Sequence, residues 1–199
     1  MSNDPVSNDP VSNGAANNDA VSNGAVGNHA GDDARVKNDV ESKHADHRFT
    51  TRSEFETHFM QCVSLSKANL SLFDPDFAVF PLGSSATDAA LRHFLGQGGH
   101  LQIAMHRTEV IERQYPRFMR LLKDYGHRME CRVTSRPLRT LTDSFCIGDN
   151  VHIVRRFHSD HMRGEAVMND PLATEISRER FTGIWAESLP GLHATTTGL

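Results

Sequence analysis

The stretch Ser144-Phe-Cys-Ile-Gly-Asp-Asn-Val-His-Ile-Val154 contains two short apolar runs separated by a turn sequence. Gly, Asp and Asn tolerate the backbone conformations of a tight turn, so the stretch predicts two antiparallel strands joined at Gly148-Asp149-Asn150. Another strand pattern follows at residues 164–168. No helical pattern separates these strands, which indicates that this part of a sheet is built from consecutive strands.

Helical and extended patterns alternate in the residues before this hairpin. Apolar residues at helical spacing predict helices that begin at the capping box Ser53-x-x-Glu56, at Ser84 or Ser85, and at Thr108, where Pro116 kinks or restarts the helix. Alternating apolar residues predict strands near residues 70–73, 101–105 and 129–133. A last helix begins at Asp170-Pro171 and runs toward Pro190. The order α-β-α-β-α-β-β-β-β-α predicts an α/β fold with a mixed β-sheet flanked by helices.

Residues 1–50 differ in composition from the rest of the chain. They contain no Leu, no Ile and no aromatic residue before Phe49, and Ser-Asn-Asp-Pro-Val begins at both Ser2 and Ser7. Such a segment cannot bury enough apolar surface to offset the entropy that is lost on ordering. We therefore predict a disordered low-complexity tail over residues 1–50 and one folded α/β domain over residues 51–199.

The net charge of the chain resides in this tail. Its eight acidic and four basic residues account for the formal charge of −4, which leaves the remaining residues neutral. A neutral domain argues against strong nonspecific binding to nucleic acid or anionic lipid, although a local basic patch is compatible with it. No apolar run resembles a secretory signal or is long enough to span a bilayer, so we expect a cytoplasmic location and no membrane partner.

The cysteines and histidines give no strong sign of a metal or a disulfide. Cys62, Cys131 and Cys146 are odd in number and lack Cys-x-x-Cys spacing, which favours packed free thiols. His158-Ser-Asp-His161 contains common metal ligands, but no second cluster stands at ligand spacing from it, so a solvated turn is expected. We predict no metal and no cofactor.

The order of strand, turn, strand, Glu-bearing strand and Trp-bearing helix resembles a half-domain of the phospholipase D family. The family signature is His-x-Lys-x4-Asp, followed by Gly-Ser-x-Asn and then by Asn-x-Glu. The first motif falls on Thr142–Asp149, with Thr142 in place of the His, Ser144 in place of the Lys, and Asp149 at the Asp. Arg155-Arg-Phe-His158 falls on the second motif and Arg163-Gly-Glu165 on the third. The likeness is greatest to bacterial phospholipase D-like domains of unknown function.

This resemblance implies a domain that lacks the usual chemistry of the family. In active members an imidazole attacks phosphorus, and the Lys stabilises the phosphoryl oxygens. Thr142 has neither the nucleophilicity of an imidazole at neutral pH nor its acid–base range, and Ser144 carries no positive charge. We therefore favour a non-catalytic protein and assign no catalytic residue.

The resemblance also places five side chains together, where the phosphate pocket of the family lies: Ser144, Asp149, Arg156, His158 and Glu165. An arginine beside a histidine is suited to hold an anion, which predicts a phosphate-bearing ligand or a protein partner. A structural Arg156–Glu165 ion pair in a decayed site is the other interpretation of these residues.

Two further functions stay open. One is a phosphodiesterase or phosphotransferase that uses a relocated histidine such as His158, and the other is a purely structural interaction module. Half-domains of active members often pair, so the resemblance also implies a homodimer.

Overall fold

The structure is a computed structural model and describes residues 47–193. Its strands in chain order are β1 (His47–Phe49), β2 (Asn69–Phe73), β3 (His100–Met105), β4 (Met129–Thr134), β5 (Ser144–Gly148), β6 (His152–Arg156), β7 (Gly164–Val167) and β8 (Ser188–Pro190). Its α-helices are α1 (Arg52–Leu65), α2 (Ser85–Gly96), α3 (Glu109–Gln114), α4 (Pro116–Asp124) and α5 (Pro171–Ala186), and a short 3-10 helix, η1, covers Arg136–Thr140.

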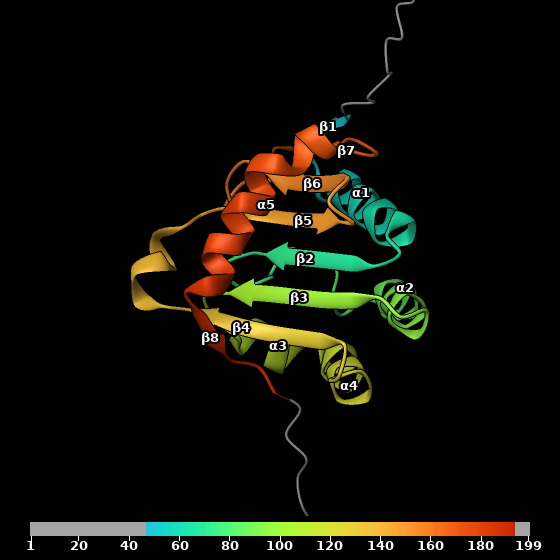
Figure 1. Cartoon of the computed structure of the whole chain (residues 1–199), viewed down its shortest axis with the longest axis vertical. Coiled ribbons are helices and arrows are strands. Elements are labelled where there is room, and N and C mark those ends of the chain that lie inside the picture. The colour runs from blue at the N-terminus through green and yellow to red at the C-terminus, as the bar shows by residue number, and fades with distance from the viewer. Residues whose placement is uncertain (1–46, 194–199) are drawn as a thin grey trace, which may run out of the picture. The chain divides into compact units, whose positions relative to one another are not determined.

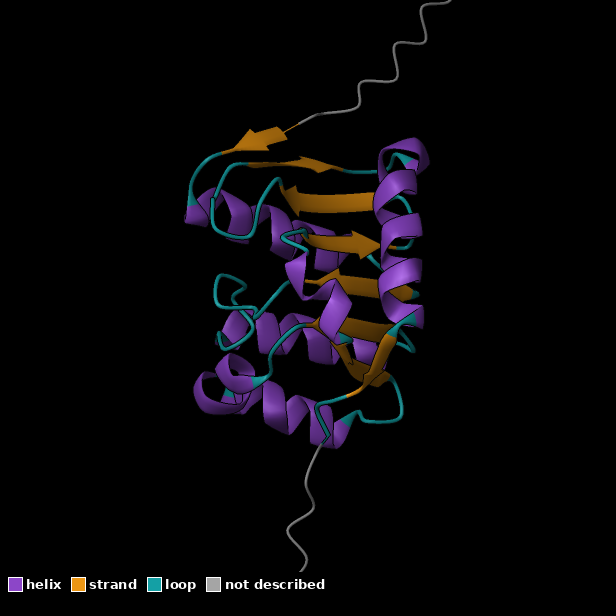
Figure 2. Cartoon of the chain, turned by 90° about the vertical axis from the view of Figure 1, so that its left-hand side faces the viewer, coloured by secondary structure: helices purple, strands orange, loops and turns teal. Residues whose placement is uncertain are grey.

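The eight strands form one mixed sheet in the order β1-β7-β6-β5-β2-β3-β4-β8. β2, β3 and β4 are parallel to one another, whereas all the other neighbouring strands are antiparallel. Helices α1 to α4 cover one face of this sheet, and α5 crosses the other face (Figures 1 and 2). The predicted α/β class, with a mixed sheet flanked by helices, is confirmed.

Two apolar clusters hold the layers together. The larger lies between the sheet and α1 to α4, and in it the rings of Phe55 and Phe59 each meet the ring of Phe80 edge to face. The smaller lies under α5 and contains Phe145 and Phe181. Each fully buried Leu or Phe contributes roughly 1.5–3 kcal/mol through the hydrophobic effect, so both helix layers are fixed firmly to the sheet.

Three predicted elements differ in detail from the structure. The capping box of α1 is Thr51 with Glu54, two residues before the predicted one, and it satisfies backbone N–H groups at the start of the helix. The helix predicted over 108–125 is two helices, because Tyr115 before Pro116 leaves the helical conformation at φ −119° and ψ 63°. The last helix ends at Ala186, and the chain then forms β8 beside β4.

The sheet also begins earlier than predicted. β1 lies within the range assigned to the tail and pairs with β7, where Phe49 opposes Gly164. The side chain of Phe49 is buried, so the folded domain includes residues before Thr51. The predicted disorder of residues 1–46 lies outside the described part of the chain.

The direction of the strands gathers polar side chains at one edge of the sheet. β2, β3 and β4 end at the left-hand edge in Figure 1, β5 begins there, and β6 ends there. The β5–β6 hairpin turns at Gly148–Asn150 as predicted, with Asp149 and Asn150 at positive φ. Residues just after β2 and β3 therefore lie near the first residue of β5 and the last residue of β6.

The three cysteines are free and buried, as predicted. The sulfur atoms of Cys62 on α1 and Cys146 on β5 are 3.7 Å apart inside the larger cluster. Burial raises the pKa of Cys131 to about 12. A thiol with so high a pKa stays protonated and acts as a packing group.

Candidate functional site

Arg156 lies at the centre of a buried polar cluster at the left-hand edge of the sheet. Its Nε atom donates to the Ser144 hydroxyl at 3.0 Å, and Nη1 donates to the Ser159 carbonyl at 2.6 Å. Nη2 donates to Asp74 Oδ2 at 2.7 Å, and the two side chains of this ion pair are 2% and 1% exposed. All three guanidinium nitrogens thus have a partner within the protein, and the pair is almost fully removed from water.

Asp74 is fixed from both sides. It follows β2 directly, and its Oδ1 atom accepts hydrogen bonds from the backbone N–H groups of Asp76 and Phe77. Its other oxygen faces Arg156. The Asp74 carboxylate thus accepts from three donors, one of which belongs to the oppositely charged Arg156, so both of its oxygens are held in place.

His106 is a second buried polar residue at this edge, and the sequence analysis did not identify it. Nε2 lies 2.9 Å from the Leu141 carbonyl oxygen, which can only accept, so Nε2 carries a hydrogen. Nδ1 lies 2.6 Å from the Thr134 hydroxyl and accepts from it in the neutral ring. Both ring nitrogens are occupied, which makes this imidazole a structural group. His106 and Asp74 each directly follow a strand that the sequence predicts, and this position is the signal that could have identified them.

His158 lies on the loop after β6 and is 40% exposed. Its Nδ1 atom accepts a hydrogen bond from the backbone N–H of Asp160 at 3.1 Å, so the hydrogen of the neutral ring is on Nε2. The ring centroid lies 5.5 Å from that of His161. In this arrangement neither nitrogen of His158 offers an unoccupied lone pair to a substrate.

Glu165 does not pair with Arg156, so the predicted Arg156–Glu165 ion pair is wrong. Glu165 accepts from Nε of Arg155 at 2.7 Å instead. The register of β6 and β7 places Arg155 directly opposite Glu165. Side chains alternate between the two faces of a strand, so Arg156 points to the opposite face and toward Asp74.

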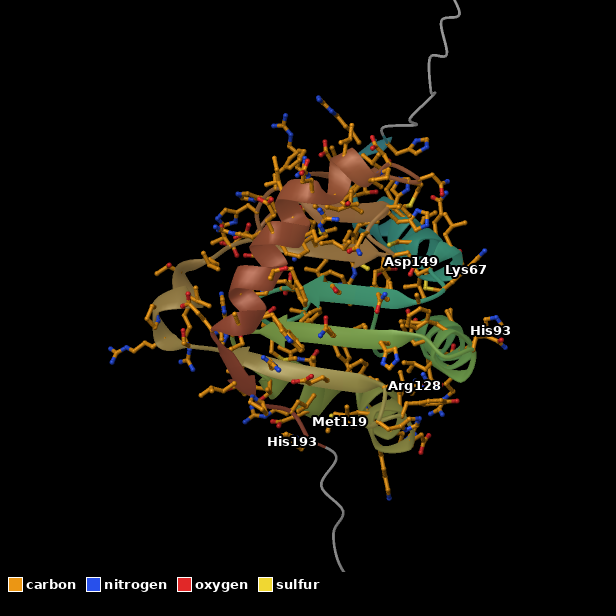
Figure 3. All side chains as sticks on the ribbon, viewed as in Figure 1. Lys67, His93, Met119, Arg128, Asp149 and His193 are labelled. Carbon is orange, nitrogen blue, oxygen red and sulfur yellow. The ribbon has the colours of Figure 1, made fainter. Side chains whose placement is uncertain are left out.

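Asp149 lies at the other edge of the sheet, which contradicts the predicted convergence of the five side chains. Figure 3 shows it beside Lys67, in the turn between β5 and β6. Its carboxylate accepts from the backbone N–H groups of Lys67, Ala68 and Asn69. Burial by itself raises the pKa of this carboxyl, but the three donors outweigh it and lower the pKa. Asp149 therefore fixes the connection from α1 to β2.

A groove of about 520 Å³ opens beside the buried cluster, between α5 and the ends of β5 and β6. Its polar lining includes Thr142, Ser144 and three arginines, and Phe157 and Ile176 form apolar parts of its wall. Each of the arginines has an acidic partner: Arg155 pairs with Glu165, Arg156 with Asp74, and Arg180 with Asp143. The charges that line the groove are thus neutralised within the chain.

The groove is the one place where predicted site residues come together. Ser144 and Arg156 oppose each other on β5 and β6, and Ser159 of the following loop donates its N–H to the Thr142 carbonyl. His158 is on that loop, whereas Glu165 contacts the groove only through Arg155 and Asp149 is remote. Within residues 47–193, no three His, Cys, Asp or Glu side chains are arranged to hold a metal ion.

None of the helices in the described part of the chain is long and apolar enough to cross a membrane.

A family model described as "Domain of unknown function (DUF7931)" matches residues 51–193. No match to the chain was found among curated proteins.

Several solved structures share the fold at low sequence identity. Nuc, a phospholipase D family member from Salmonella typhimurium, is similar with a TM-score of 0.55 and 15% identity, over 74% of this chain and 97% of Nuc. The archaeal chromatin protein TrmBL2, whose structure shows a novel mode of DNA binding, has a TM-score of 0.57 and 11% identity. Phosphatidylserine synthase from Haemophilus influenzae has a TM-score of 0.55 and 10% identity. This chain spans 56% of TrmBL2 and 41% of the synthase.

Proposed function

Because this chain belongs to the DUF7931 family and has a phospholipase D-like fold, we propose that it is a non-catalytic domain that binds a protein partner. The observation that supports this proposal is the buried ion pair between Asp74 and Arg156. The resemblance places the phosphate-binding motifs of the family at this edge. In this chain the carboxylate of Asp74 already pairs with the guanidinium of Arg156 there. A phosphate ligand would have to displace Asp74 and leave a buried carboxylate without its partner, which costs several kcal/mol.

The groove beside the ion pair favours a protein surface over a phosphate-bearing ligand. Its three guanidinium groups are each neutralised by a carboxylate of the chain. Phe157 and Ile176, which line it, are 50% and 76% exposed. Exposed apolar side chains surrounded by paired charges are typical of sites that bind proteins.

His106 and His158 give no support to the alternative of a relocated catalytic histidine. His106 uses both ring nitrogens in buried hydrogen bonds, and the lone pair of His158 is taken by a backbone N–H. A general base or nucleophile needs a lone pair directed at the substrate. The names of the structural neighbours do not decide between these functions, because the similarity to them is limited to the fold.

The decisive experiment is hydrolysis of bis(p-nitrophenyl) phosphate by the full chain, beside His158→Ala and an active phospholipase D enzyme. We expect no turnover by either form of this chain while the active enzyme works. Turnover by the parent that disappears in His158→Ala would overturn the proposal and identify His158 as catalytic.

The melting temperature of the same protein tests whether the groove binds a phosphate-bearing ligand. We expect inorganic phosphate and glycerol phosphate to leave the melting temperature unchanged, because no guanidinium in the groove lacks an acidic partner. A rise in melting temperature that Arg180→Ala or Arg155→Ala abolishes would show that the groove binds a phosphate-bearing ligand instead of a protein.

A further inference from the structure

A second cavity lies between α1 and α2, at the edge of the sheet opposite the groove. The two helices pack side by side, and both end where the strands β2 and β3 begin (Figure 1). A pocket of about 700 Å³ opens between their last turns, and it is larger than the groove beside α5. Small-molecule sites typically have volumes of about 300–1,000 Å³, so this α1–α2 pocket has the size of a ligand site.

The floor of the α1–α2 pocket is apolar. Val63 and Phe94 line it and belong to the larger apolar cluster, and Ala90 lines it and packs against that cluster. The side chain of Ala90 ends at Cβ, which leaves the wall formed by α2 open at this position. Burial of hydrocarbon against such a floor is favourable, because it removes apolar surface from water on both sides.

The rim of the α1–α2 pocket is cationic and carries hydrogen-bond donors. Lys67, His93 and Gln97 are exposed there, and none of the described residues that line the pocket is acidic. Figure 3 shows Lys67 and His93 at the right-hand edge, with Asp149 beside Lys67. Both oxygens of Asp149 accept from backbone N–H groups, and no carboxylate within residues 47–193 forms an ion pair with the Lys67 ammonium. This ammonium is therefore available to a ligand, unlike the paired arginines of the groove.

The ends of the two helices do not cancel this positive charge. The C-terminal carbonyls of a helix carry a partial negative charge that disfavours an anion. The carbonyls of residues 93–95 in α2 already accept from the N–H groups of residues 97–99, a turn that Gly98 permits at φ 100°. In α1 the Cys62 carbonyl accepts from both the N–H and the hydroxyl of Ser66. These carbonyls are thus directed at the protein's own donors.

We propose that the α1–α2 pocket binds a small carboxylate with an apolar body. The apolar body lies on Val63, Ala90 and Phe94, and the carboxylate faces the donors at the rim. One permanent positive charge at the rim matches a singly charged carboxylate better than a doubly charged phosphate. The site goes beyond the proposed function, because it is separate from the groove and takes a small molecule.

Isothermal titration calorimetry of the full chain with decanoate measures this binding. We expect saturable binding of decanoate and none of acetate, because acetate has no body to cover the apolar floor. Decanol has the same hydrocarbon chain without the charge, and we expect it to bind about three-fold more weakly or less tightly still. The absence of saturable decanoate binding would overturn the site.

Lys67→Met tests the position of the carboxylate, since it removes the ammonium and keeps an apolar side chain. We expect decanoate to bind this variant about as weakly as decanol does, with the affinity for decanol little changed. Lys123→Met is the matched control, because it removes an exposed lysine of α4 that does not line the pocket, and it should preserve the preference for decanoate. An equal loss of both ligands in Lys67→Met would contradict a charge contact.

Ala90→Leu tests the floor of the pocket. Its longer side chain occupies the space of the hydrocarbon, so we expect both decanoate and decanol to bind about ten-fold more weakly or worse. Thermal unfolding without ligand establishes that the variant is folded. In the parent chain, which needs no substitution, nuclear Overhauser effects should connect the decanoate chain with the Ala90 methyl group and the Phe94 ring.

The exposed apolar side chains of the groove are the competing site for decanoate. Ile176→Glu places a negative charge there and should leave the affinity for decanoate unchanged, because Ile176 does not line the α1–α2 pocket. Loss of binding in Ile176→Glu, with binding retained in Ala90→Leu, would overturn the proposal and place the ligand in the groove.

Discussion

Asp74 and Arg156 are separated by 82 residues in the chain, yet their charged groups are 2.7 Å apart and almost completely buried. This ion pair joins the end of β2 to the end of β6, and Ser144 on β5 accepts a further hydrogen bond from the same guanidinium. A buried pair of this kind is costly to break, because either partner left alone is a charge without water and without a counterion.

We expect Asp74→Asn to lower the free energy of unfolding by about 3 kcal/mol or more, because it leaves the Arg156 guanidinium buried and unpaired. Urea unfolding at neutral pH measures the change. Glu56→Gln is the control, since its pair with Arg52 is largely exposed and removing it should cost less than about 1 kcal/mol. The double variant Asp74→Asn, Arg156→Met should lose clearly less than the sum of the single losses, and strict additivity would show that the pair is not coupled.

Introducing a lysine at position 144 should damage the domain without making it an enzyme. Ser144 is buried and accepts from Arg156, so Ser144→Lys places a second cation beside the first and should cost about 3 kcal/mol or more. Ser144→Ala, which removes only one hydrogen bond, should cost about 1.5–3 kcal/mol. Urea unfolding and the phosphodiester assay are run on both variants and on Thr142→His, Ser144→Lys. A stable double variant that hydrolyses the diester would show that the edge is a competent active site.

The strand β1 should stabilise the domain even though it is short. Phe49 is 1% exposed and packs against Phe55, with their ring centroids 5.7 Å apart. We therefore expect Phe49→Ala to cost about 3–5 kcal/mol in urea unfolding, and a chain that begins at Thr51 to lose at least as much. Arg48→Ala in the same strand is the comparison, because its side chain is exposed and the change should stay within about 0.5 kcal/mol. Equal stability of all four proteins would mean that β1 does not belong to the folded unit.

Asp149 should make stability depend on pH in the acid range. Burial raises the pKa of its carboxyl, but the three backbone donors outweigh it, so the folded pKa lies below the unfolded value of 3.8. The ionised form thus stabilises the fold above pH 3.8, and this contribution disappears as the pH falls through the folded pKa. Asp149→Asn should cost about 1–3 kcal/mol at pH 7, and the difference from the parent should shrink on acidification below the unfolded pKa. A difference that stays constant on acidification would exclude the carboxylate as its cause.

Elements with strong local signals were predictable from the sequence. The turn at Gly148-Asp149-Asn150 was identified because its residues tolerate positive φ, and the start of α5 because Asp170 precedes a proline. The start of α1 was misplaced because Thr51 and Ser53 each stand three residues before a glutamate. The two candidates are equivalent in sequence, and the structure places the helix so that Phe55 and Phe59 are buried. β1 and β8 have three residues each, too few for a periodic pattern, and they exist because a neighbouring strand pairs with them.

The candidate site was less predictable than the fold, because its contacts depend on strand register. Arg155 and Arg156 are adjacent, and only the alignment of β6 with β7 decides which of them meets Glu165. The partner of Arg156 comes from the end of a strand far away in sequence, and no spacing rule connects Asp74 to it. Asp149 was placed in the site by its position in a motif, whereas the hairpin directs it to the opposite edge.

The central position of β2 has a consequence for synthesis of the chain on the ribosome. β2 pairs with β3, which follows it closely in the chain, but its other neighbour, β5, is synthesised much later. β1 likewise has no pairing strand until β7 has been synthesised. A nascent chain that ends before Ser144 therefore exposes an unpaired strand edge in the middle of the future sheet, and Asp74 has no counterion. Such edges associate readily with other chains. Nearly the whole domain must therefore be synthesised before the sheet can close, and the edge of β2 stays unpaired until β5 has been made.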